Sequence, residues 1–374
     1  MRAIDQYTDT FGEQPGYLDW AAFGPMSPGA ATALRDTAAL LATGRRADVD
    51  AASAAGVAAR TGVADLLGAA SDEVTLHPSS THALQQALAG LDGAVIASAA
   101  EFPSVTITLD RAAAAAQGRL LPRWISPART RVTPDAVAEA LDPAVSALVV
   151  SHVDFRSGYR ADLAALREVL GPDRLLIVDA VQSFGVVDED WSVADVVVGH
   201  GYKWLRAGRG TGFARFADAA RERIRPVLSG RIATAADGLP TDALPAPAAS
   251  AQAFAVSAPD PLAAARLATA ATEIRGAGVA AVAAALADRV DAVIAIADRH
   301  RIPVGSPRGE AERAGIVVLE VARPEELGAA LAAAGVDVTQ RAGTVRVSPH
   351  AGTSEDTLAM LDAALAGAQE FIGS

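Results

Sequence analysis

Lys203 and Asp179 are the residues of this sequence whose types and spacing point most directly to chemistry. Asp179 ends an apolar run at residues 175–178, and Lys203 follows a second apolar run at residues 196–199. Both runs have the composition of strands that are buried in a parallel sheet. Because the carboxyl ends of such strands meet at the edge where ligands bind, the acid and the amine are expected to face one crevice.

An amine and a carboxylate in this setting have two interpretations. One is structural: a buried ion pair, or an Asp that caps a turn while the lysine reaches solvent. The other is catalytic, because apolar surroundings lower the pKa of a lysine and let it form a Schiff base, while an anionic Asp keeps a pyridine nitrogen protonated. Lys203 and Asp179 together are then typical of a pyridoxal 5'-phosphate (PLP) site, and the apolar surroundings favour this second interpretation.

A phosphate site is predicted at Ser80, Thr81 and His82, where a predicted strand passes into a predicted helix. The first backbone N–H groups of a helix have no partner within it, and the positive end of the helix dipole favours an anion. An ordinary N-cap explains the same residues. In company with the acid and the amine, we expect this helix start to hold the phosphate of the cofactor.

The composition excludes several classes of function. A net charge of −12 and a pI near 5.0 leave no basic footprint for nucleic acid or an anionic membrane surface. The chain has no cysteine, which removes disulfides, thiolate metal sites and a cysteine nucleophile. The six histidines lack the spacing of a metal site, so no metal is predicted. No signal peptide or membrane span is recognisable, and we expect a cytoplasmic protein.

The pattern of the chain predicts an α/β fold. Apolar runs alternate with helical patterns, as in a mostly parallel sheet covered by helices. Seven strands are predicted, at residues 73–78, 94–98, 119–125, 146–153, 175–181, 195–201 and 211–216. Helices are predicted between them at 79–91, 104–118, 133–141 and 160–171.

The C-terminal region predicts a smaller α+β unit. Two alanine-rich helices, from Pro261 and across residues 279–300, precede strands at 315–321 and 344–350 that flank a helix at 324–335. We therefore expect three parts. They are an N-terminal segment at residues 1–20 that packs on the small domain, a large cofactor-binding domain at 21–245, and a small C-terminal domain at 246–374.

Several motifs, in their order and spacing, resemble the class V aminotransferase family of fold type I PLP enzymes, the superfamily of cysteine desulfurases and kynureninases. The resemblance covers most of the chain and implies the same two-domain fold. It rests on "YLDWAAFGPMSP", "SSTHALQQAL", "AEFPSVTI", "VVSHVDFRSGY", "DAVQ", "HGYKW" with the Gly-rich loop after it, and "TVRVSPHAGTSEDTL".

The resemblance implies roles around the cofactor ring. Lys203 would form the Schiff base and then carry the α-proton of the substrate. Asp179 would pair with the pyridine nitrogen, and Gln182 would lie near the phenolic oxygen of the ring. Phe102 would lie over the ring face.

The resemblance also implies the residues at the phosphate. Thr81, with backbone groups of Ser80 and His82, would hold it, joined by His200 and Tyr202. Many members of the family have a histidine where this chain has Tyr202. A tyrosine at this position resembles the pattern of the kynureninase-like branch.

Arg346 would bind the carboxylate of the substrate, a role that suits its planar pair of donors. His152 is a second candidate for contact with the substrate, although a strand-end histidine with structural partners explains it equally well. Arg156 and Arg160 are candidates for a second anionic group of the substrate, although arginines on solvated loops are the more usual case.

The resemblance to this family predicts the cofactor more firmly than it predicts the reaction. We expect a small α-amino acid as substrate and an aminotransferase-like reaction. A β-lyase that cleaves C–S bonds, a kynureninase-like enzyme that cleaves C–C bonds and an epimerase remain as alternatives. A cysteine desulfurase that carries persulfide on its own thiol is excluded because the chain has no cysteine. A non-catalytic PLP-binding protein is disfavoured by the intact lysine, aspartate and arginine set. The resemblance also implies a homodimer with active sites near the interface.

Overall fold

The seven predicted strands form one sheet in the structure, a computed structural model in which residues 2–126, 131–235, 244–341 and 343–372 are described. Their order across the sheet is β1-β7-β6-β5-β4-β2-β3. The pairs β3–β2, β2–β4, β4–β5 and β5–β6 are parallel, whereas β7 runs antiparallel to both β1 and β6. The bounds are β1 Val74–His77, β2 Gly93–Ser98, β3 Leu120–Ile125, β4 Val145–Ser151, β5 Leu175–Asp179, β6 Val196–His200 and β7 Gly212–Phe216. The predicted fold class is confirmed.

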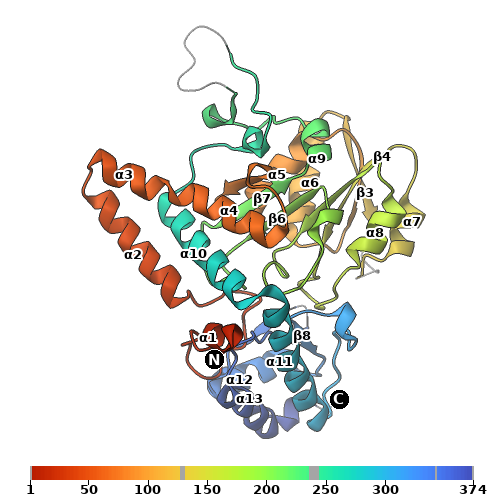
Figure 1. Ribbon diagram of the computed structural model, residues 1–374. Coiled ribbons are helices and arrows are strands. Elements are labelled where there is room, and N and C mark those ends of the chain that lie inside the picture. Colours follow the sequence, from red (N-terminus) through yellow and green to blue (C-terminus); the bar gives the residue numbers. More distant parts are fainter. Residues whose placement is uncertain (1, 127–130, 236–243, 342, 373–374) are drawn as a thin grey trace.

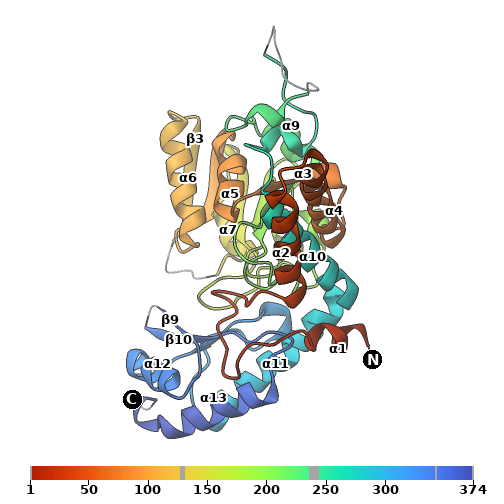
Figure 2. The same cartoon turned by 90° about the vertical axis from the view of Figure 1, so that its left-hand side faces the viewer.

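The central strands are buried on both faces. Leu175 and Ile177 of β5 pack into one apolar core, while Leu176 and Val178 pack into the other, as the alternation of side chains along a strand requires. Helices α5, α6 and α9 cover the first core, and α4, α7, α8 and α10 cover the second. Figure 2 shows the sheet between these helical layers, with α5 and α6 on one side and α2 and α10 on the other. The continuous apolar composition of the strands follows from this double burial.

The helices take these bounds: α1 Ala3–Thr8, α2 Pro28–Ala42, α3 Arg46–Ser53, α4 Ala55–Leu67, α5 Ser80–Ala89, α6 Pro103–Ala115, α7 Pro134–Ala140, α8 Leu163–Leu170, α9 Asp218–Arg223, α10 Pro261–Ala277, α11 Val279–Arg299, α12 Pro324–Ala333 and α13 Glu355–Gly367. Short 3₁₀ helices lie at Ser71–Glu73, Trp191–Val193, Arg231–Ala233, Ala251–Phe254, Glu310–Glu312 and Gln369–Phe371. Within the described residues, none of the helices combines the length and apolar character needed to cross a membrane.

A second, antiparallel sheet of order β8-β10-β9 lies with α11, α12 and α13 beyond one end of the large sheet (Figure 1). Its strands are β8 Val317–Leu319, β9 Thr339–Arg341 and β10 Thr344–Val347. The N-terminal segment lies along this unit, because Tyr17 bridges to Asp337 and Asp19 bridges to Ser348. Helix α10 instead packs against α2 and α4 of the larger unit. The domain boundaries at residues 20 and 245 stay predictions.

Candidate active site

Three neighbouring strands end beside one cavity. Ser151 at the end of β4 lies opposite Asp179 at the end of β5, and His200 ends β6. These residues line a cavity of ≈ 190 Å³, together with Lys203 from the loop that follows β6. The carboxyl ends of the parallel strands therefore bring the acid and the amine to one crevice, as open α/β sheets do.

Asp179 is 5% exposed, and its Oδ1 accepts a hydrogen bond of 2.9 Å from the backbone N–H of Val181. Burial raises the pKa of Asp179 to about 6, while that hydrogen bond and the charge of Lys203 lower it. At neutral pH the group is therefore mostly an anion held at the floor of the cavity.

Lys203 is 6% exposed. Burial, followed by the charge of Arg346, lowers the pKa of Lys203 to about 7, while Asp179 opposes the shift. In the part of the chain that the structure describes, no carboxylate lies within ion-pair distance of Nζ. The structural interpretation of a closed Asp–Lys ion pair therefore does not hold, and a neutral amine is accessible near pH 7.

Aromatic rings surround the amine. The Nζ of Lys203 lies 6.0 Å from the ring centroid of Phe102 and 5.7 Å from that of Tyr202. The ring of Tyr202 stacks on that of His200 at 3.8 Å. Burial lowers the pKa of His200 well below its usual value, so this imidazole is neutral. Phe102, His200 and Tyr202 all line the cavity.

The start of α5 forms one end of the cavity. Ser80 and Thr81 line it, and Oγ1 of Thr81 lies 2.9 Å from Oγ of Ser104. The hydroxyl of Ser79 caps the helix by accepting from the backbone N–H of His82. The imidazole of His82 lies 3.2 Å from that same hydroxyl and lines a different cavity.

The glycines after Lys203 let β7 approach this helix start. Gly208 and Gly210 have φ values of 73° and 87°, which favour glycine. A Cβ on Gly212 would come within 2.6 Å of the backbone of Ser79. A side chain at Gly212 would therefore displace the turn that opens α5.

Gln182, in the loop after β5, bonds to the loop after β6 and to the N-terminal segment. Its Nε2 donates to the carbonyl of Ala21 at 3.0 Å, and its Oε1 accepts from Nε1 of Trp204 at 2.9 Å. Gln182 lines the cavity, but its amide is already engaged on both sides.

Arg346 and His152 do not line the cavity. Nη1 of Arg346 donates to the carbonyl of Phe155 at 3.0 Å, and Nη2 lies 3.3 Å from a carboxylate oxygen of Asp19. The Phe155 side chain lines the cavity, so Arg346 lies directly behind its wall. His152 is fully buried, with Nε2 at 3.1 Å from Glu189.

Glu101 had no predicted role. Its carboxylate accepts from the backbone N–H of Ser151 at 2.9 Å and also from the Ser151 hydroxyl. Burial raises the pKa of Glu101 to about 7. Its position directly before Phe102 was the only signal in the sequence, and that signal does not distinguish it from a surface acid.

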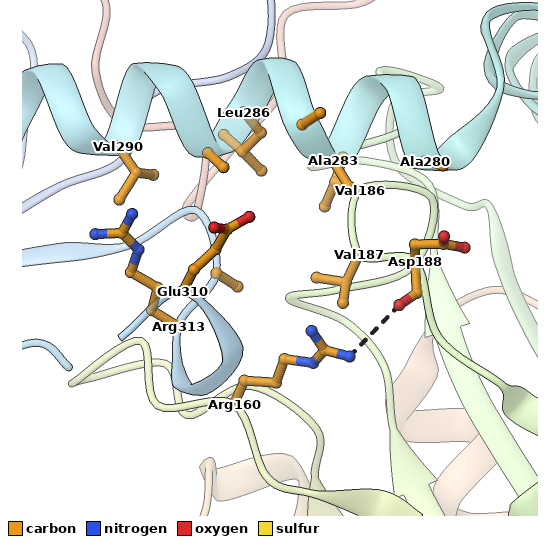
Figure 3. Close-up of a pocket in the computed structure, with 13 residues that line it drawn as sticks. Arg160, Val186, Val187, Asp188, Ala280, Ala283, Leu286, Val290, Glu310 and Arg313 are labelled. Carbon is orange, nitrogen blue, oxygen red and sulfur yellow. Dashed lines mark hydrogen bonds between the residues drawn. The ribbon is translucent and has the colours of Figure 1, made fainter. Parts of the chain in front are cut away.

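A second cavity, of ≈ 260 Å³, lies between α11, the segment at residues 186–188 and the segment at 310–314 (Figure 3). Arg160 points into it and donates to the backbone carbonyl of Asp188 and to Glu189. Arg313 on its far side pairs with Asp291. Its arginines are therefore already paired, and Arg160 does not reach the cavity at Lys203.

Comparisons with known proteins place this geometry in a family. Residues 17–351 match the Aminotransferase class-V family. No curated protein sequence matches the chain.

Solved structures share the fold at low identity. A structure of C-DES with glycine covalently linked to its PLP cofactor is 18% identical, with a TM-score of 0.84, and covers 96% of this chain and 97% of its own. The cysteine desulfurase CsdA of Escherichia coli is 18% identical, with a TM-score of 0.83 over 98% of each chain. A cysteine desulfurase of Thermococcus onnurineus NA1 is 19% identical, with a TM-score of 0.79 over 95% of this chain and 94% of its own.

These similarities extend over nearly the whole chain and include both of its sheets. The chain belongs to the class V aminotransferase family of PLP-dependent enzymes, with the fold type I architecture.

Proposed function

We propose that this protein binds PLP through Lys203 and acts on a small α-amino acid, with an aminotransferase-like reaction. One observation carries the proposal: a buried amine, for which the described residues provide no ion-pair partner, lines a cavity that Asp179 also lines. Burial lowers the pKa of Lys203 to about 7, which leaves a large fraction of the amine neutral and nucleophilic at neutral pH.

The cavity suits the phosphate of the cofactor. The backbone N–H groups of Ser80 and Thr81 belong to the first turn of α5, where they have no acceptor within the helix. Within the described residues, Nδ1 of His200 is a buried atom without a hydrogen-bond partner. We assign the phosphate to this end, with Thr81, His200 and Tyr202 around it and the backbone of His82 in support.

The remaining assignments concern the ring and the substrate. Asp179 is the anion that would face the pyridine nitrogen, with Gln182 beside the ring and Phe102 over its face. Arg346 would receive the α-carboxylate once Phe155 allows access, and His152 would support the wall from behind.

When bound, PLP supplies an aldehyde that takes up an amine and a ring that draws electrons from the bonds at the α-carbon. Lys203 then holds and returns the α-proton at its Nζ, because its pKa lies near the working pH. Asp179 stays negative and keeps positive charge on the ring nitrogen.

A β-lyase is the second candidate. One structure that shares the fold is described as a complex of the cystine C-S lyase C-DES with cysteine persulfide, at 18% identity. This chain has no cysteine to carry sulfur, so such an enzyme would release its sulfur product directly. Kynureninase-like C–C cleavage and epimerisation use the same lysine and aspartate.

A panel of amino acids incubated with the PLP-loaded protein distinguishes these reactions. Transamination converts the bound cofactor to its amine form and gives one keto acid per site in the absence of a keto-acid acceptor. Elimination instead gives pyruvate over many turnovers and leaves the absorbance of the cofactor unchanged. A protein that takes up no PLP would contradict the proposal as a whole.

We also propose a homodimer that joins at the α5–α6 face. An apolar groove of ≈ 550 Å³ runs along these helices and shares Thr81 and Ser104 with the candidate site. Ile107 is 55% exposed on this face. Sedimentation should give a dimer that Ile107→Arg weakens, whereas a monomer for the unaltered protein would contradict the assignment.

A further inference from the structure

Three guanidinium groups gather around Phe155 at the wall of the candidate site. Arg156 lies 5.4 Å from the centroid of the Phe155 ring, and Arg341 lies 5.0 Å from it. Arg346 donates to the Phe155 carbonyl at 3.0 Å. Phe155 itself lines the cavity that holds Lys203. Three guanidinium groups therefore lie together at one wall of the cavity in a protein whose net charge is −12.

Two of these three charges are balanced by acids. Arg156 pairs with Asp154 at 3.2 Å, and Arg346 pairs with Asp19 at 3.3 Å. For Arg341, which is exposed, the described residues provide no acidic partner. Among the described residues, its guanidinium contacts the ring of Phe155, a residue that lines the cavity. Arg341 is therefore a cation that is held at the site but not neutralised there.

The small sheet aims Arg341 and Arg346 in the same direction. In the antiparallel pair β9–β10, Thr344 lies opposite Arg341 and Arg346 lies opposite Thr339. Residues two apart on a strand share a face, so the two arginines are diagonal neighbours on one face, about 7–8 Å apart between their backbones. Thr339 completes that face, since its hydroxyl donates to Asp19 at 2.6 Å and accepts from Arg346 at 3.2 Å.

The field of Arg341 reaches the reactive amine. Its charge lowers the pKa of Lys203, although by less than burial and Arg346 do, and it also lowers the pKa of Arg346. An uncompensated cation this close to other cations costs free energy in the folded protein. A ligand with a second negative charge would remove that cost on binding.

We propose that Arg341 recognises a second anionic group on the substrate, so that the substrate is an amino acid with an acidic side chain. This inference rests on the proposed function, in which Arg346 takes the α-carboxylate. Arg341 then acts as the specificity-determining residue, and the substrate reaches it, as it reaches Arg346, once Phe155 allows access. A side chain with a carboxylate matches the planar donor set of the guanidinium.

The test uses ligands that do not react with the cofactor. The affinities of the PLP-loaded protein for succinate and glutarate are measured by calorimetry and compared with those for succinamate and glutaramate, which have the same lengths and one charge fewer. We expect at least one dicarboxylate to bind about 10- to 100-fold more tightly than its monoamide, the usual effect of one hydrogen bond to a charged group.

Arg341→Gln should abolish that preference by weakening the dicarboxylate alone. Arg323→Gln is the matched control, because Arg323 lies 4.8 Å over the ring of Phe371 in the same unit but away from the cavity. This control should retain the full preference. The same pattern is expected in KM for aspartate or glutamate against asparagine or glutamine.

Equal binding of dicarboxylates and monoamides by the unaltered protein would overturn the inference. It would also be overturned if Arg341→Gln weakened both ligands equally, since Arg341 would then act on the fold or on Lys203. These outcomes leave the proposed function intact when the absorbance shows bound PLP. A protein that does not take up PLP at all would overturn both.

Discussion

Lys203 and Arg206 are two buried basic residues in one loop, and they differ in their hydrogen-bond partners. Arg206 is 2% exposed, and its Nη1 and Nη2 donate to the hydroxyl and the carbonyl of Thr10 at 2.8 and 2.7 Å. Its guanidinium also lies 3.8 Å over the ring of Phe11. Lys203, 6% exposed, has no such partners and faces a cavity.

This difference indicates that Arg206 stabilises the fold, whereas Lys203 serves the reaction. Arg206 fastens the N-terminal segment to the loop, and it does so with φ at 62°, a conformation that few residues other than glycine adopt. The described residues provide no partner for the amine of Lys203. A buried amine of this kind lowers the stability of the fold unless a bound ligand pairs with it. Proteins retain this kind of cost mostly at functional sites.

The largest expected effect is the loss of activity in Lys203→Ala. Removing the group that carries the cofactor and moves the proton should lower kcat by about 1,000-fold or more. Steady-state kinetics with the preferred amino acid measures this. Activity within tenfold of the unaltered protein would mean that Lys203 is a structural residue like Arg206.

Arg206→Met should destabilise the fold instead. The variant removes two hydrogen bonds of a buried charge and its stacking on Phe11, so we expect a loss of about 3 kcal/mol in the free energy of unfolding. Urea denaturation measures this loss. An Arg206→Met variant that kept its stability but lost its activity would contradict the structural role of Arg206.

Asp179→Asn tests the acid at the same strand edge. The amide keeps the oxygen that accepts from the Val181 N–H but removes the charge that faces the amine. We expect kcat to fall by about 100-fold, the usual effect of losing one electrostatic contact in a reacting site. Circular dichroism should show an unchanged fold, so a parallel loss of structure would argue against a catalytic role.

Lys203→Met should raise the stability of the PLP-free protein at pH 7 and below, where the folded chain bears the cost of the buried, protonated amine. Because burial lowers the pKa of Lys203 from 10.5 to about 7, the folded chain disfavours the protonated amine. The destabilisation is complete below pH 7 and is lost as the pH rises to 10.5. The gap between the two proteins in urea denaturation should therefore shrink from pH 7 to pH 10, and a constant gap would contradict it.

The centre of the large sheet was predictable because its strands are apolar on both faces. All residues of β5 and β6 are buried, whereas Leu121 and Trp124 of the edge strand β3 are exposed. The helices α2, α3, α4 and α13 were not predicted. Alanine dominates them, and it occupies buried and exposed positions alike; of α2, only Ala30 and Thr37 are buried.

The sequence predicted which residues lie together at the site, but it did not predict their hydrogen bonds. Strand ends bring Asp179, His200 and Lys203 together by topology alone. Whether Gln182 faces the ring or bonds to Trp204 depends on side-chain rotamers and on distant segments such as Ala21. Arg341 gave no signal, because its own strand, β9, was not predicted and Phe155, whose ring it contacts, lies far from it in the sequence.

We propose that Lys203 carries the cofactor, and the composition of the chain makes this directly testable. Lys203 is the only lysine among the 374 residues. After incubation with PLP and reduction with borohydride, mass spectrometry of peptides should show one pyridoxyl phosphate adduct on the peptide that contains Lys203, and none in Lys203→Ala. A reduced protein with no adduct at Lys203, or with its adduct only on the N-terminal amine, would contradict the account.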